Sequence, residues 1–87
     1  MNVSQKDTFK EVIILDKKKL EALMKLNGDT GGDLAECLGI ARSTFSAKLN
    51  ETNGAEFTQR EIAAIKVRYK LNAEQIDETF FTEKVSY

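Results

Sequence analysis

One stretch decides the fold: Gly31-Gly32-Asp33-Leu34-Ala35-Glu36-Cys37-Leu38-Gly39-Ile40-Ala41-Arg42-Ser43-Thr44-Phe45-Ser46-Ala47-Lys48-Leu49. It predicts two short helices that meet at Gly39. For two helices to cross at about 90–120° through a short turn, the first must bring a small side chain to the contact and the turn must tolerate a positive φ. Ala35 and Gly39 meet these two demands. Ile40 and Phe45 supply the apolar side chains that fill the space between the helices.

Residues that typically begin and end helices support this interpretation. Thr30 and Asp33 have the spacing of a capping box, which predicts that the first of the two helices begins after Thr30 and ends at Gly39. The second is predicted from about Ala41 to Asn50, followed by a loop over residues 51–56 that is rich in polar and turn-forming residues.

The flanking segments predict three more helices. An apolar i, i+3, i+4 stripe indicates a helix from about Asp16 to Leu26. Thr58 and Glu61 form a second capping-box sequence that opens the fourth helix, and Asn72 caps the fifth. The spacing places ten side chains in the core: Leu34, Ala35, Leu38, Ile40, Phe45, Leu49, Ile62, Ile65, Ile76 and Phe80. The sequence therefore predicts an all-α protein of five helices.

The two ends of the chain are less regular. Residues 1–15 are predicted to be an N-terminal extension in which Val12–Leu15 forms a strand or extends the first helix backwards. Residues 82–87 are predicted to be a C-terminal tail that pairs with the N-terminal segment or with another protomer. The compact domain is expected to span residues 16–81.

Composition limits the possible functions. The chain has 87 residues, no histidine, one cysteine and a net charge of −1. The absence of histidine removes the commonest acid–base, triad and metal-ligand chemistry, so we expect no enzyme, cofactor, metal or small-molecule substrate. The longest apolar run has four residues, against about 20 for a membrane helix, so we expect a cytoplasmic protein. Cys37 is interpreted as a small, half-buried apolar residue.

The central stretch resembles the helix-turn-helix of the lambda-repressor and Cro superfamily. The resemblance lies in the pattern Leu34-Ala35-x-x-Leu38-Gly39-Ile40-x-x-Ser43-Thr44-Phe45-Ser46 and covers about residues 16–80. Residues 57–62 and 80–85 are similar to a group of small Cro-like regulators of Gram-positive bacteria and their phages. The resemblance implies a compact five-helix lambda-repressor-like DNA-binding domain whose third helix lies in the major groove.

The side chains of that helix suit base and phosphate contacts. Arg42 can bind guanine O6 and N7 together, or a phosphate. The short hydroxyls of Ser43 and Ser46 can serve several base edges, and Ala47 can pack on a thymine methyl. Lys48 is a candidate for a contact with the DNA backbone, and Thr44 for a phosphate contact or for support of the helix. Asn50 is a candidate for a base or phosphate contact.

Two helix starts are candidate phosphate clamps, because free backbone N–H groups attract anions. The residues concerned are Thr30, Gly31, Thr58, Gln59 and Arg60. At Gly31 the chain departs from many relatives of the superfamily, which carry glutamine there, so only amide groups remain at that position and Arg60 gains importance.

The leading hypothesis is a phage-type transcriptional regulator, a repressor or a Cro-like protein, that binds a palindromic DNA operator as a homodimer. Apolar residues of the last helix and the tail are the expected dimer contacts: Phe80, Phe81, Val85 and Tyr87. The alternative is a protein-interaction module on the same fold, such as an anti-repressor or an antitoxin.

Overall fold

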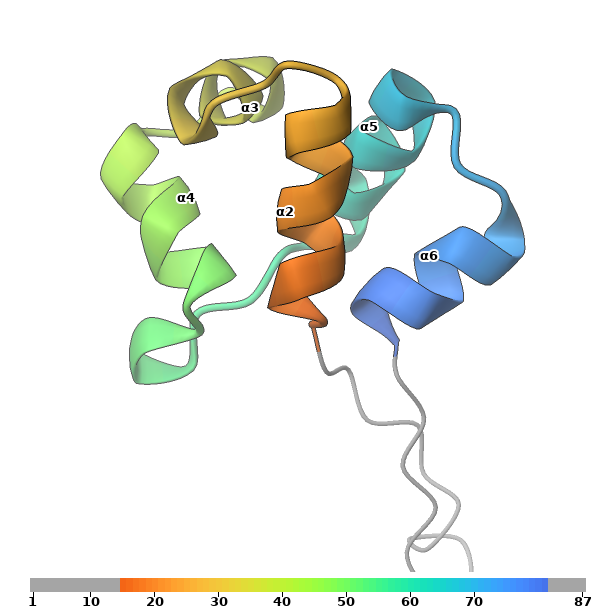
Figure 1. Cartoon of the computed structure of the whole chain (residues 1–87). Coiled ribbons are helices and arrows are strands. Elements are labelled where there is room, and N and C mark those ends of the chain that lie inside the picture. Colours follow the sequence, from red (N-terminus) through yellow and green to blue (C-terminus); the bar gives the residue numbers. More distant parts are fainter. Residues whose placement is uncertain (1–14, 82–87) are drawn as a thin grey trace, which may run out of the picture.

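The computed structural model describes residues 15–81, and this part of the chain contains five α-helices, one short 3₁₀ turn and no strand (Figure 1). The helices are α2 (Lys17–Leu26), α3 (Gly31–Leu38), α4 (Arg42–Leu49), α5 (Gln59–Tyr69) and α6 (Ala73–Phe80). The predicted all-α class and the five helices are confirmed. The expectations for residues 12–14 and for the tail at 82–87 lie outside the described residues.

Side-chain caps fix where four of the helices begin: Asp16 caps α2, and capping boxes open α3, α5 and α6. Both predicted capping boxes are present: Thr30 with Asp33 at the start of α3, and Thr58 with Glu61 at the start of α5. Asn72 caps α6 as expected, and it does so in a third box in which Gln75 is the reciprocal partner. Each box satisfies two backbone N–H groups that a helix start leaves without a partner.

A single apolar core joins the five helices. Three phenylalanine rings pack edge to face across it, with ring centroids 5.8 Å apart for Phe45 and Phe57 and 6.0 Å apart for Phe57 and Phe80. Burying each such ring contributes about 1.5–3 kcal/mol. The other buried apolar residues are Leu20, Met24, Leu34, Ala35, Ile62, Ile65, Tyr69, Leu71 and Ile76. The predicted core residues Leu38, Ile40 and Leu49 are partly buried at its edge.

The turn between α3 and α4 has the predicted positive φ. Gly39 has a φ of 71° and a ψ of 29°, in the left-handed region where a β-carbon is costly. The chain then turns immediately, because the backbone N–H of Ile40 donates to the carbonyl oxygen of Ala35 at 3.0 Å. Ala41 is extended, and α4 begins at the next residue.

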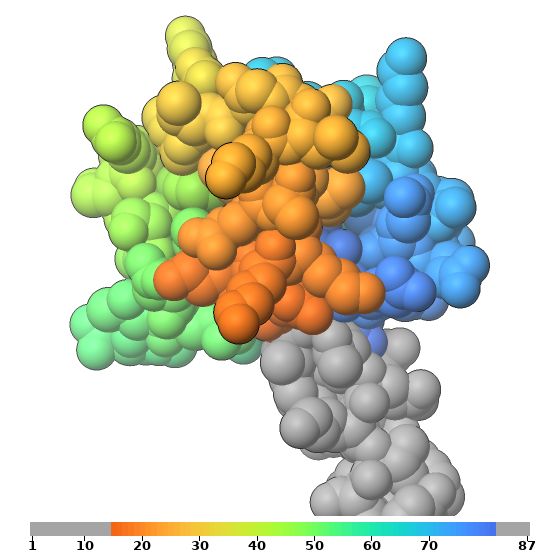
Figure 2. Space-filling model, in the orientation of Figure 1, coloured from red at the N-terminus to blue at the C-terminus, as the bar shows by residue number. Residues whose placement is uncertain are grey.

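Helices α4 and α6 lie on opposite sides of α2 (Figure 1). In the same view, the space-filling surface shows α2 running between α3 and α4 on one side and α6 on the other (Figure 2). The start of α2 is held to the end of α6, since the Asp16 N–H donates to the Thr79 carbonyl oxygen at 2.7 Å. No helix within residues 15–81 is long and apolar enough to cross a membrane.

One expectation about the surface is wrong. Cys37 is exposed, not half-buried, and it lies close enough to Arg68 to interact with the guanidinium group. Arg68 is far away in the sequence, so a search for basic neighbours along the chain could not find it.

Candidate nucleic-acid interface

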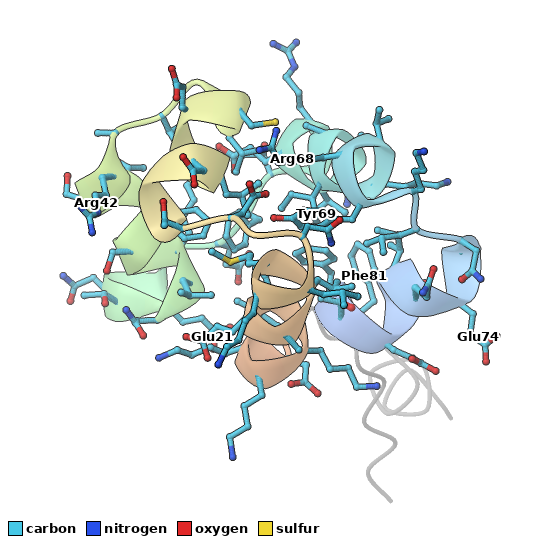
Figure 3. All side chains as sticks on the ribbon, turned by 45° about the horizontal axis from the view of Figure 1, so that its top comes forward. Glu21, Arg42, Arg68, Tyr69, Glu74 and Phe81 are labelled. Atoms are coloured by element: carbon cyan, nitrogen blue, oxygen red, sulfur yellow. The ribbon has the colours of Figure 1, made fainter. Side chains whose placement is uncertain are left out.

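The outer face of α4 is polar and exposed. Phe45 is 2% exposed and fixes the helix to the core, and this orientation turns the side chains of Arg42, Ser43 and Thr44 to the surface. Ser46 is exposed as well, and Ala47 beside it is half-buried. Figure 3 shows Arg42 at the outer edge of α4, away from Arg68 and Tyr69. The structure therefore gathers these predicted side chains on one accessible face.

The first turn of α4 combines a cation with uncapped backbone amides. Ala41 occupies the N-cap position and makes no side-chain cap hydrogen bond. A β-carbon built on Gly32 would lie 4.0 Å from Cδ of Arg42, so the stem of Arg42 runs beside the start of α3. A guanidinium group next to open helix N–H groups is a favourable place for an anion or an electron-rich base edge.

The polar side chain at the C-terminal end of α4 is engaged in hydrogen bonds within the chain. The Asn50 side-chain amide donates to the Ser46 carbonyl oxygen at 2.9 Å and to the Ser46 hydroxyl at 3.3 Å. The Asn50 side-chain oxygen accepts from the Lys17 ammonium at the start of α2. Lys17 therefore joins this face from another helix. In the sequence, the lysine run at residues 17–19 is typical of a solvated face and only weakly indicates a nonspecific DNA contact.

Lys48 has a different partner from the predicted one. Its ammonium donates to both carboxylate oxygens of Glu61, at 2.7 and 2.8 Å, and its side chain is only 15% exposed. The expected DNA-backbone contact would require this partly buried ion pair to break. We therefore remove Lys48 from the candidate DNA-contacting residues.

Glu61 is a buried carboxylate that the sequence showed only as a cap. Burial alone would raise its pKa, but the hydrogen bonds from Lys48 and from the Thr58 backbone N–H outweigh this effect and hold the pKa of Glu61 below its ordinary value. Glu61 is therefore ionised at neutral pH, as its pairing with Lys48 requires.

The candidate phosphate clamps at α3 and α5 are partly used inside the chain. In α3 the box engages the Thr30 hydroxyl and the N–H groups of Thr30 and Asp33. The first-turn amide of Gly31 takes no part in this box, and neither does that of Gln59 in the box at α5. Arg60 is exposed beside them. The clamps are thus reduced to first-turn amides and, at α5, one arginine.

The loop before α3 is held by a charged cluster at the end of α5. Asp29 accepts hydrogen bonds from Arg68 and from the Tyr69 hydroxyl, and these lower the pKa of Asp29 to about 2. Burial, together with the same hydrogen bond to Asp29, raises the pKa of Tyr69. The cluster fixes the position from which α3 starts.

The predicted dimer contacts need a correction. Phe80 is 1% exposed and belongs to the core, so it is not free to contact a second protomer. Phe81 is partly buried against the same core, and Val85 and Tyr87 lie outside the described residues. The large apolar side chains that residues 15–81 do expose are Leu26, at 82%, and Val67, at 76%.

Within the described residues, no group of three or more histidine, cysteine, aspartate or glutamate side chains is arranged to hold a metal ion. Comparison with known proteins found no match to the chain among family models, curated proteins or solved structures.

Proposed function

We propose that the chain is a sequence-specific DNA-binding transcriptional regulator of the phage or prophage type, a repressor or Cro-like protein of the lambda-repressor superfamily. In this proposal α4 enters the major groove and reads base edges with Arg42, Ser43 and Ser46. One observation carries the proposal: the buried ring of Phe45 holds α4 so that its polar side, headed by Arg42, is open to solvent.

The distribution of charge supports this orientation despite the net charge of −1. Lys17 and Arg42 lie on the α4 side of the molecule, whereas α6 exposes Glu74 and Asp77. Figure 3 shows Arg42 and Glu74 at opposite edges. A local pair of cations beside the exposed face of α4 can bind the phosphate backbone even when the whole chain is nearly neutral.

The exposed carboxylate of Glu51 limits where DNA can approach. It directly follows the capped end of α4, and Asn50 at that end is engaged by Lys17 and Ser46. We therefore place the base contacts at the N-terminal half of α4. Arg60 and the first-turn amides of α5 provide the phosphate contact.

A palindromic operator requires two copies of the chain, and we assign the dimer contact to the groove between α2 and α6. Seven residues line its apolar part and its rim: Lys19, Ala22, Leu23, Leu26, Gln75, Glu78 and Thr79. Lys19 and Glu78 pair with each other across this groove within one copy, at 3.2 Å, so the apolar side chains of the groove would provide the contact with a second copy. This surface lies across α2 from α4 (Figure 1), so dimerisation leaves the DNA-reading face open.

The test is selection of bound duplexes from a random DNA pool, followed by titration of the recovered duplex at several salt concentrations. We expect a palindromic consensus with half-sites about 34–36 Å apart or a multiple of this spacing. The logarithm of the binding constant should fall with the logarithm of salt concentration, with a slope of about −0.9 per phosphate contact. A pool without enrichment and a flat salt response would instead favour a protein-interaction module.

A further inference from the structure

We infer that Glu61 is a positioning residue that ties the base-reading helix α4 to the phosphate-binding end of α5, with Lys48 as its counter-ion. The inference rests on the proposed function, because it concerns how two proposed DNA-contacting elements are held in register. It also gives Lys48 a role that is not a DNA contact.

One carboxylate makes both connections. Glu61 Oε1 accepts from the Thr58 backbone N–H at 2.9 Å and so closes the capping box that starts α5. The same oxygen lies 2.7 Å from Nζ of Lys48, and Oε2 lies 2.8 Å from it. Lys48 is in the last turn of α4. The end of α4 and the start of α5 are therefore joined through a single side chain.

The Lys48–Glu61 pair matters because the segment between α4 and α5 is exposed and irregular. Residues 51–54 are exposed, and two non-glycine residues there have a positive φ, Glu51 at 54° and Asn53 at 53°. Such a connection has few buried contacts to set the distance between the helices. Phe57 anchors its end to the Phe45 ring, and the Lys48–Glu61 pair supplies the polar bridge.

The pair also sets the charge at the start of α5. A carboxylate next to a helix N-terminus would repel a phosphate, but here the Lys48 ammonium neutralises it at hydrogen-bond distance. The box at α3 is different, because its exposed Asp33 carboxylate is held by the Thr30 backbone N–H and side chain, and no lysine within residues 15–81 is hydrogen-bonded to it. The start of α5 is accordingly the better phosphate site of the two.

Three variants test the inference: Lys48→Met, Glu61→Gln and the double variant. Glutamine can keep the capping box at residue 61, since Gln75 closes the equivalent box of α6. Lys48→Met leaves a buried carboxylate without its counter-ion, and we expect DNA affinity to fall by about tenfold or more. Glu61→Gln alone breaks the same bridge but keeps the charge of Lys48, so it should lower the affinity by a similar factor, and the double variant should bind no more weakly than either single variant.

Binding is measured on the duplex that the wild-type chain selects, at a temperature where circular dichroism shows every variant folded. Lys66→Met, which removes an exposed lysine from α5, is the control for loss of one positive charge. If Glu61→Gln binds as tightly as the wild type while Lys48→Met is weakened, Lys48 contacts DNA itself and the inference is wrong. If the variants change only the melting temperature, the pair serves stability alone and the inference is equally wrong.

Failure of the proposed function is a separate result. In that case the wild-type chain selects no duplex at all, and the inference falls with it. When the wild type binds, both single variants lose affinity and their losses do not add in the double variant, both stand.

Discussion

Arg68 on α5 binds Asp29 with two parallel hydrogen bonds, from Nε at 2.7 Å and from Nη2 at 2.8 Å. The hydroxyl of Tyr69 adds a third bond to the same carboxylate, at 2.6 Å. Asp29 immediately precedes Thr30, the cap of α3. The end of α5 thus fixes the start of α3, at a point where the local sequence offers only a glycine and a loop.

This cluster predicts a loss of stability in acid. The pKa of Asp29 is about 2 in the folded chain, below its ordinary value of 3.8. A lowered carboxylate pKa stabilises the fold above the unfolded value, and this contribution is lost as the pH falls from about 4 towards 2. We expect the free energy of unfolding to drop by about 1–2 kcal/mol from this group, since solvent screens part of the interaction.

Urea unfolding at a series of pH values measures the effect. Asp29→Asn should lower stability at neutral pH and flatten the profile between pH 4 and 2, because the group that titrates there is gone. Asp77→Asn, an exposed position on α6, is the control and should keep the wild-type profile. An Asp29→Asn profile as steep as that of the wild type would show that other carboxylates cause the acid sensitivity.

Helix positions were predictable because their signals are local. The capping boxes at Thr30 and Thr58 are written in residues three apart, and the positive φ of Gly39 follows from the need for a sharp turn. The face that α4 exposes could also be predicted, since Phe45 is the large apolar residue that orients it. These features depend on spacing along the chain and little on distant partners.

The errors share a different cause, which is tertiary contact. In the sequence Lys48 looks like a surface cation, but in the fold it pairs with Glu61 of α5. Cys37 has no basic neighbour along the chain, but in the fold it interacts with Arg68. The sequence predicts Phe80 both as a core residue and as a dimer contact, and its side chain, at 1% exposure, belongs to the core. A pairing between side chains on different helices leaves no periodic trace in the sequence.

The turn between α3 and α4 provides a stability prediction with an internal control. Gly39 has a φ of 71°, so Gly39→Ala should cost about 1 kcal/mol by forcing a β-carbon into the left-handed region. Gly32 lies inside α3, where a β-carbon would meet only ordinary contacts at 3.7 and 4.0 Å. Gly32→Ala should therefore raise stability by about 0.5–1 kcal/mol.

Thermal or urea unfolding of both variants gives the comparison. Opposite signs are expected from the same chemical change, because only the backbone conformation differs. Equal destabilisation would mean that the helix around Gly32 needs the absence of a side chain, for example to accommodate the stem of Arg42.

Leu26 provides the test of the proposed dimer surface. It is 82% exposed in the groove between α2 and α6, so Leu26→Gln should weaken self-association without loss of folding. Val67→Gln is the matched control, since Val67 is 76% exposed on α5 and does not line the groove. Sedimentation equilibrium over a range of concentrations should show a raised dissociation constant for Leu26→Gln alone. Equal effects of both substitutions, or a wild-type chain that stays monomeric throughout, would contradict this assignment.

Arg42 and Arg60 should differ in how their loss affects DNA binding. Both are exposed, but Arg42 heads α4, the proposed base-reading helix, and Arg60 lies in the first turn of α5. Arg42→Ala should reduce discrimination at one base position by about 1–3 kcal/mol, because a bidentate contact to guanine is lost there. Arg60→Ala should weaken binding to all sequences alike and reduce the salt slope by about one contact. Affinities for a set of duplexes with single base changes, each at several salt concentrations, separate the two effects. The same uniform loss from both substitutions would place Arg42 on the phosphate backbone and move base recognition to the serines of α4.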